Sequence, residues 1–204
     1  EFTTAKPILR PRDILVRVVA CATNPVDTKL RAGRGKPGPL EERRIFGFDG
    51  AGTIEAVGSE TSLRSVGEKV YFAGSHIRDG ANAELVAVDE RIVAVAPKTI
   101  SLTKAAALPL VGLTAWEGLF EAAGMPIVPS ARLFSKKRLL MLPGAGGVGS
   151  LVALMGMGAL SGSSGDVRVG VASKMWKQCR FWNFICKLSS NERPIAITSP
   201  TDFI

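Results

Sequence analysis

The fold is indicated most clearly by the stretch Arg138-Leu-Leu-Met-Leu-Pro-Gly144-Ala-Gly146-Gly147-Val-Gly149-Ser150. A short apolar run ends at glycines spaced G-x-G-x-x-G, and an apolar, helix-compatible run over residues 151–154 follows. Glycine allows a tight turn with exposed backbone N–H groups, and a helix that starts there points its positive end at the same place. The order strand, glycine turn, helix is typical of a dinucleotide-binding unit. We therefore expect the pyrophosphate of a dinucleotide to be bound by Gly144, Ala145, Gly146, Gly147, Val148 and Gly149.

Two other interpretations of this stretch are open from the residues alone. The first is an ordinary glycine-rich surface loop. The second is a membrane span, because no charged residue occurs between Arg138 and Asp166, and a span needs about 20 apolar residues. The stretch contains eight glycines, a proline and a cluster of serines, which favours a buried strand, a turn and a buried helix. We expect no membrane-spanning segment.

Composition indicates a packed globular protein. The chain has 204 residues, 46% of them hydrophobic, and it begins without an initiator Met or a signal peptide, as if partway into a longer protein. Its three cysteines, Cys21, Cys179 and Cys186, form no C-x-x-C pair, which fits a reducing cytoplasm. The net charge is +8. We assign this charge to a solvated surface and an anionic cofactor rather than to nucleic acid, because no basic face with interleaved aromatics appears before the tail.

The first half of the chain reads as β-rich. Short strand-like runs separated by turn residues favour a small barrel or sandwich. A helical turn is expected at residues 105–108 before Pro109, with Ser101 or Thr103 as a cap, and a helix is expected at residues 113–123. The strands are expected at residues 13–20, 51–57, 69–73, 83–88 and 92–96.

These motifs together resemble those of the medium-chain dehydrogenase/reductase superfamily, and most of all its zinc-type alcohol dehydrogenase-like and quinone oxidoreductase branch. The resemblance implies a β-rich GroES-like domain followed by a partial α/β Rossmann domain. We expect the GroES-like domain and a helical connection at residues 1–124, a linker at 125–135, and the partial NADP-binding domain at 136–204. The matching stretches are Asn24-Pro-Val-Asp-Thr-Lys29, Phe46-Gly-Phe-Asp-Gly-Ala-Gly-Thr53, Val66-Gly-Glu-Lys-Val-Tyr-Phe-Ala-Gly74, Ala106-Ala-Leu-Pro109, Gly112-Leu-Thr-Ala-Trp116 and the glycine turn.

The sequence departs from the zinc-dependent members of this family. They have a Cys-His-x-Asp run where this chain has Asn24-Pro-Val-Asp27, and Gly-His-Glu where it has Gly47-Phe48-Asp49. A catalytic zinc needs about three N, S or O ligands from the protein. The single histidine, His76, lies in a polar stretch. We therefore expect neither a catalytic nor a structural zinc.

The expected cofactor is NADPH rather than NADH. NAD sites carry an acidic residue about 20 residues after the glycine motif. Here the second strand, residues 167–172, is followed by Ser173 and Lys174, a hydroxyl and a cation that suit a 2′-phosphate. Asp166 precedes that strand and is badly placed for the ribose. An ordinary turn at the end of a strand is the alternative interpretation of Ser173 and Lys174.

The resemblance also implies an activity. Zinc-independent relatives transfer hydride from NADPH to a quinone or an activated carbonyl or double bond. By resemblance, Asn24 and Asp27, with Lys29 as a weaker candidate, lie near the nicotinamide, and Thr114 contacts the nicotinamide end of the cofactor. A capped turn is the structural alternative for residues 24–27, since Asn and Asp both favour turns.

The second departure is the tail. After Lys174 the family pattern fades into an aromatic and basic segment, and residues 189–204 show no clear alternation of strand and helix. We interpret the tail as a truncated or altered end that lacks the later strands of the domain. The alternative function is therefore a non-catalytic GroES-like fragment that binds a partner or has no activity. Full-length relatives are implied to be homodimers, and we do not expect that assembly here.

Overall fold

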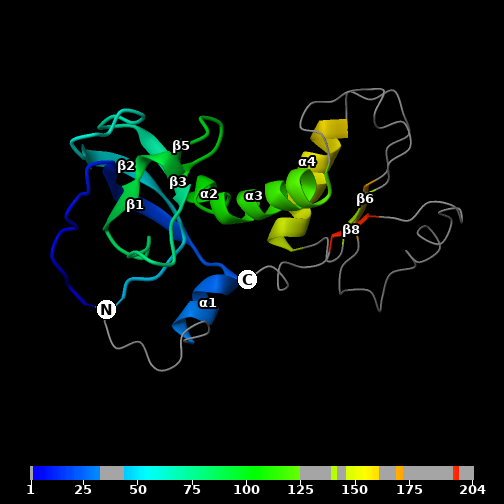
Figure 1. Ribbon diagram of the computed structural model, residues 1–204, viewed down its shortest axis with the longest axis horizontal. Helices are drawn as coiled ribbons and strands as arrows, with labels where there is room; N and C mark the ends of the chain where they lie inside the picture. Colours follow the sequence, from blue (N-terminus) through cyan, green and yellow to red (C-terminus); the bar gives the residue numbers. More distant parts are fainter. Residues whose placement is uncertain are drawn as a thin grey trace, which may run out of the picture. The chain divides into compact units, whose positions relative to one another are not determined.

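The computed structural model describes residues 2–32, 44–124, 139–141, 146–160, 169–171 and 195–197. The chain divides into two compact units, Glu1–Leu110 and Val111–Ile204 (Figure 1). Each unit has its own sheet, so each is described separately.

The first unit is built on a five-stranded antiparallel sheet with the order β4-β1-β2-β3-β5. The edge strands β4 and β5 do not pair with each other. Five strands were expected from the sequence and five are found, with bounds that differ by a few residues. They are β1 (Asp13–Ala22), β2 (Asp49–Val57), β3 (Lys69–Ala73), β4 (Leu85–Asp89) and β5 (Val93–Val95).

The core of this unit follows from the alternation of side chains along the strands. Successive residues of a strand point to opposite faces of the sheet, so every second apolar residue reaches the same core. In β3, for example, Val70 and Phe72 are buried while Lys69 is exposed. The buried cluster consists of Ile14, Val16, Ile54, Val70, Phe72, Ala81, Val86, Val88 and Val93.

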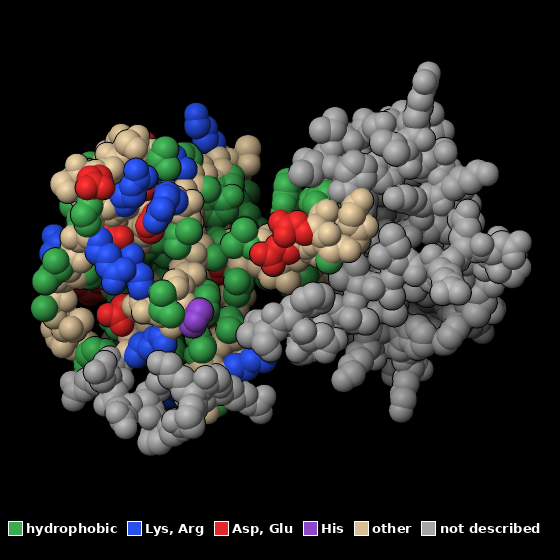
Figure 2. Space-filling model, viewed as in Figure 1, with side chains coloured by type: hydrophobic (Ala, Val, Ile, Leu, Met, Phe, Trp, Pro, Cys, Tyr) green, Lys and Arg blue, Asp and Glu red, His purple; other side chains and the backbone are tan. Residues whose placement is uncertain are grey.

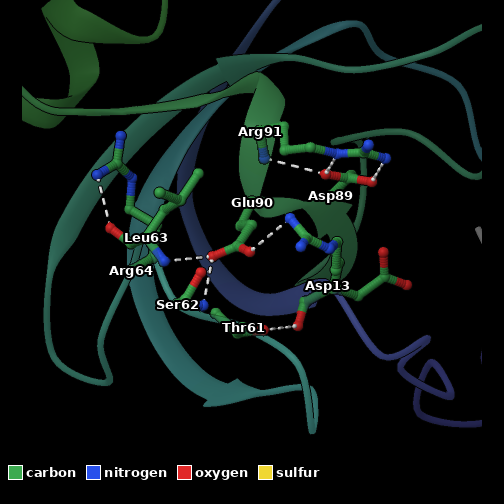
Figure 3. A network of polar contacts seen from close by, with 9 residues as sticks. Asp13, Thr61, Ser62, Leu63, Arg64, Asp89, Glu90 and Arg91 are labelled. Atoms are coloured by element: carbon green, nitrogen blue, oxygen red, sulfur yellow. Dashed lines mark hydrogen bonds and ion pairs between the residues drawn. The ribbon is translucent and has the colours of Figure 1, made fainter.

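The loop between β2 and β3 is attached to the sheet by polar contacts (Figure 3). Glu90, in the short 3-10 helix η1 (Glu90–Ile92), is completely buried, and its Oε2 accepts hydrogen bonds from the N–H groups of Ser62 and Leu63 at 2.9 and 2.6 Å. Arg12 lies 3.7 Å from the other carboxylate oxygen. Arg64 donates from Nε and Nη2 to the carbonyl oxygen of Val93, the first residue of β5.

A buried ion pair attaches the following loop to β1. Asp13 is 1% exposed, and its two carboxylate oxygens accept hydrogen bonds from Arg78 at 2.8 and 2.6 Å. Burial raises the pKa of Asp13, but the hydrogen bonds from Arg78 and from the N–H of Arg10 outweigh it and hold the pKa below its usual value.

Two helices lead towards the second unit. Helix α2 (Leu102–Ala105) is capped by Ser101, whose side chain accepts from the N–H of Lys104. The helical turn expected at residues 105–108 is therefore found slightly earlier. Pro109 does not end a helix but begins α3 (Pro109–Trp116), because proline fits the first turn, where its missing N–H is not needed. The same helix continues as a π-helix, η2 (Glu117–Ala122).

The second unit contains a three-stranded parallel sheet with the order β7-β6-β8. Strand β6 (Leu139–Met141) is followed by α4 (Gly147–Leu160) and then by β7 (Val169–Val171), the strand-helix-strand order of a Rossmann domain. Strand β8 (Ile195–Ile197) lies within the tail. No strand was predicted for residues 189–204, so β8 is an addition to the predicted elements.

Candidate functional site

The predicted residues Asn24 and Asp27 lie at the start of α1 (Pro25–Arg31). Asn24 is the N-cap residue, with an extended backbone, and Pro25 occupies the first helical position. The carboxylate of Asp27 accepts a hydrogen bond from the N–H of Asn24 at 2.8 Å. Residues 24–27 thus form a capped helix start, as the structural alternative supposed, and their role towards a ligand stays a prediction.

Asn24 also contacts a buried carboxylate that the sequence analysis did not place among the site residues. Its Nδ2 donates a hydrogen bond to Oδ2 of Asp49 at 2.8 Å. Oδ1 of Asp49 accepts from the backbone N–H of Leu110, also at 2.8 Å. Asp49 is 1% exposed at the start of β2, and Asn24 is 9% exposed. One carboxylate therefore connects β2 with the start of α1 and the start of α3.

The backbone before Asp49 explains how this carboxylate enters the interior. Gly47 has a φ of 106°, a conformation that favours glycine, and a Cβ there would collide with the side chain of Asn82. The chain can therefore turn tightly against residues 80–82 before β2 begins, with N–H groups of Ala81 and Asn82 bonded to the carbonyls of Gly47 and Phe46. The sequence contained one signal for this position, an acidic residue inside the apolar, glycine-rich run of residues 46–53.

Two carboxylates, those of Asp49 and Asp27, lie close to Asn24. Burial raises the pKa of Asp49 above its usual value, and the nearby negative charge of Asp27 adds to this, while the hydrogen bonds from Asn24 and Leu110 oppose it. Oδ1 of Asp27 is buried and has no hydrogen-bond partner among the described residues. Such an unpaired acceptor is uncommon in a folded protein. Lys29, the weaker candidate, is half-buried in the last turn of α1.

These residues do not fit a catalytic zinc ion. Both oxygens of Asp49 already accept hydrogen bonds, and Asn24 offers a neutral amide, which is not among the Cys, His, Asp and Glu ligands that zinc takes. Phe48 occupies the remaining position of the motif. Within the described ranges, no group of three His, Cys, Asp or Glu side chains is placed to hold a metal ion.

The glycine turn of the second unit leads into α4. Gly146 directly precedes the helix, and its carbonyl accepts a hydrogen bond from the N–H of Ser150 at 2.9 Å. Apart from its chain neighbours, no described atom lies within 4 Å of the position that a Cβ on Gly146 would occupy. The first turn of α4, which includes Gly147, Val148 and Gly149, carries no acidic residue. Space that the described residues leave beside a helix N-terminus without a negative side chain fits the phosphates of a dinucleotide.

Thr114 lies on α3, which packs beside this turn. A Cβ on Gly147 would lie 3.3 Å from Val111 of α3, and one on Gly112 would lie 3.7 Å from Leu151 of α4. Thr114 is half-buried on the same helix. The remaining predicted cofactor residues, Gly144, Ala145, Ser173 and Lys174, lie outside the described residues, as does the predicted linker at residues 125–135.

Surface charge on the first unit is mixed. Figure 2 shows Lys and Arg side chains interspersed with Asp and Glu on the face that it draws. Several of these charges are paired, among them Arg17 with Glu55 at 2.6 Å and Arg91 with Asp89 at 2.7 Å. The hydrogen bond from Arg91 holds the pKa of Asp89 well below its usual value. Among the helices that the structure describes, none is both long enough and apolar enough to cross a membrane.

Comparisons with known proteins agree with this architecture. Residues 10–98 match the family model for the alcohol dehydrogenase GroES-like domain. A zinc-type alcohol dehydrogenase-like protein of Staphylococcus aureus is 44% identical over 150 residues, covering 74% of this chain and 43% of the relative. A chloroplastic NADPH-dependent alkenal/one oxidoreductase of Arabidopsis thaliana is 38% identical over 158 residues, covering 74% of this chain and 39% of the relative.

A solved structure extends the similarity to both units. An alcohol dehydrogenase superfamily protein from Novosphingobium aromaticivorans superposes with a TM-score of 0.71 and 30% identity over 99% of this chain and 56% of that protein. The chain spans less than half the length of the curated relatives above. With a GroES-like domain followed by a partial Rossmann domain, and with these relatives, the chain belongs to the medium-chain dehydrogenase/reductase superfamily.

Proposed function

We propose that this chain belongs to an oxidoreductase that uses NADPH, works without zinc, and reduces a quinone or the activated double bond of an α,β-unsaturated carbonyl compound. The observation that carries the proposal is the start of α4, where the described residues leave space beside Gly146 at a helix N-terminus without an acidic residue. This combination suits a pyrophosphate, because exposed N–H groups and the helix dipole both favour negative charge.

Bound NADPH would supply a hydride to the β-carbon of the substrate, and water would supply a proton to the α-carbon, giving NADP⁺ and the saturated carbonyl compound. In this proposal Gly144 to Gly149 hold the pyrophosphate, and Thr114 holds the nicotinamide end. Asn24 and Asp27 line the site near the nicotinamide with hydrogen-bonding groups, and Lys29 is a further candidate there. None of these residues needs a metal for its role.

The choice of NADPH rests on Ser173 and Lys174. A cation and a hydroxyl after the second strand suit a 2′-phosphate, whereas an acidic residue there would suit the free ribose of NAD. The Arabidopsis relative, whose name specifies NADPH, supports the same choice.

Cofactor binding by the 204-residue chain tests the proposal. We expect NADPH to bind at least about tenfold more tightly than NADH, since a 2′-phosphate paired with Lys174 adds a charged hydrogen bond worth about 1.5–3 kcal/mol. Calorimetric titration with each cofactor measures both constants, and Lys174→Ala should remove the preference while leaving NADH binding unchanged. Tighter binding of NADH would contradict the choice of cofactor. Binding of neither would favour the non-catalytic alternative.

Substrate class is tested separately by NADPH oxidation. A soluble quinone, an α,β-unsaturated ketone and a simple aldehyde are compared at equal concentration. We expect oxidation with the first two and none with the aldehyde, because no zinc polarises an unactivated carbonyl. Reduction of the aldehyde alone would contradict the proposed substrate class.

A further inference from the structure

Asp49 lies between two donors that come from different elements. Its Oδ2 accepts from the side chain of Asn24, the N-cap of α1, and its Oδ1 accepts from the N–H of Leu110 in the first turn of α3. The carboxylate is 1% exposed, so water does not compete for these two hydrogen bonds. Both donors therefore bind the same side chain.

The chemistry of a carboxylate decides which way the amide of Asn24 faces. An ionised carboxylate only accepts hydrogen bonds, so the amide has to present its NH₂ group to Asp49. The carbonyl oxygen of Asn24 then occupies the other branch of the same planar amide and is the side-chain acceptor of the capping box at the N3 backbone of α1. Without Asp49, the two orientations of an asparagine amide are close in shape and either could be adopted.

The second hydrogen bond fixes the start of α3. The N–H of Leu110 belongs to the first turn, where a helix offers no carbonyl partner of its own. A negative charge at this end is also favoured by the helix dipole, and α3 has no acidic residue in its first turn. Asp49 therefore supplies from β2 the cap that the sequence of α3 lacks.

We propose that Asp49 is a positioning residue of the reductase site, which fixes the orientation of the Asn24 amide at the start of α1 and anchors the start of α3. The inference rests on the proposed function for its catalytic consequence. In this role one buried carboxylate, which accepts two hydrogen bonds, organises a position that metal-dependent relatives would organise around zinc.

The test exchanges the amide of Asn24 and the carboxylate of Asp49 between their two positions. Asp49→Asn places an NH₂ group against that of Asn24 or against the N–H of Leu110. If the amide of Asn24 turns over to accept from this NH₂ group, its carbonyl oxygen leaves the N3 backbone of α1, so one hydrogen bond is lost in each arrangement. The double variant Asn24→Asp/Asp49→Asn restores both, because the amide now at position 49 donates to the carboxylate now at position 24 and accepts from Leu110. It leaves a carboxylate in place of the Asn24 carbonyl. Asp89→Asn, at a carboxylate paired with Arg91, is the control for loss of one charge.

Three results are expected. Asp49→Asn lowers the midpoint of thermal unfolding and lowers kcat about 10- to 100-fold with little change in the NADPH dissociation constant, since misplacement of about 1 Å can cost about 100-fold. The double variant recovers the thermal midpoint but not kcat. Recovery of both would show a purely structural role and overturn the proposal, as would unchanged kcat in Asp49→Asn.

A measurement that does not need turnover separates this inference from the proposed function. In the ¹⁵N NMR spectrum of the wild-type chain, the side-chain NH₂ of Asn24 should exchange its hydrogens slowly with solvent, and its chemical shift should change as Asp49 titrates. Asp49→Asn should abolish both the slow exchange and the pH-dependent change in chemical shift. Fast exchange in the wild type would overturn the orientation of Asn24. If NADPH fails to bind while the NH₂ is protected, the proposed function fails and the orienting role of Asp49 stands.

Discussion

Gly146 shows how a missing side chain can define a binding site. A Cβ at this position would meet no described atom within 4 Å beyond its chain neighbours. We predict that Gly146→Val abolishes NADPH binding, because the side chain occupies the space where backbone and pyrophosphate meet. Titration calorimetry measures the loss, and Leu154→Ala, an exposed change further along α4, is the control. Unchanged affinity in Gly146→Val would show that the phosphate lies elsewhere.

The sequence predicted a helix after the glycine motif because the glycine spacing is followed by an apolar run. A helix is found, but α4 begins at Gly147, inside the motif, and not at residue 151. Asp49 was missed as a site residue because its partners, Asn24 and Leu110, are 25 and 61 positions away. Nothing within a local window reveals hydrogen bonds over such separations.

At the level of elements, Glu90 attaches the loop between β2 and β3 to the sheet. Glu90→Ala would leave the N–H groups of Ser62 and Leu63 without their acceptor, and Arg12 without its partner. We predict a loss of about 2–5 kcal/mol in the free energy of unfolding, since unpaired buried donors cost about 1–3 kcal/mol each. Urea denaturation measures the loss, and Glu60→Ala, an exposed residue of the same loop, is the control. A loss below about 0.5 kcal/mol, as for ordinary surface changes, would contradict this role.

The Asp13–Arg78 pair gives the first unit a pH-dependent contact. Arg78→Ala leaves a buried carboxylate without its cation, and we predict a loss of about 3–5 kcal/mol at pH 7. The folded-state pKa of Asp13 is lowered, so its stabilisation is complete above the unfolded value and is lost as pH falls through the folded value. The difference between wild type and Arg78→Ala should therefore shrink below about pH 4. Urea denaturation at neutral and acid pH tests it, and a difference independent of pH would contradict the assignment.

Some elements could be predicted from the sequence and others could not. The five strands of the first unit are visible because alternating apolar residues end at glycine or proline. Helix α3 was expected only from residue 113, although it begins at Pro109. A proline can follow the end of one helix or occupy the first turn of the next, so the sequence alone does not distinguish the two positions. Strand β8, Ile195–Ile197, is too short to show a period of its own.

For the whole molecule, the two units divide the proposed work between them. Asn24, Asp27 and Asp49 belong to the first unit, whereas Thr114 and the glycine turn belong to the second.

We predict that the chain retains no stoichiometric zinc, because hydrogen-bonding and apolar side chains occupy the positions where ligands would be needed. Metal analysis after purification without added zinc and exhaustive dialysis measures this. One tightly held zinc ion per chain would contradict it, and Asp49→Ala would then show whether Asp49 holds it.

The contact between Arg64 and Val93 has a consequence for how separate molecules behave towards one another. Strand β5 is an edge of the sheet, and an exposed edge offers unpaired backbone groups to which a strand from another copy can add. The guanidinium of Arg64 engages the carbonyl of Val93 with two hydrogen bonds and brings a positive charge to this edge. A strand approaching from another copy would have to displace that cation and then accept it as a neighbour. We therefore expect Arg64 to disfavour the pairing of this edge with a strand from another copy of the chain.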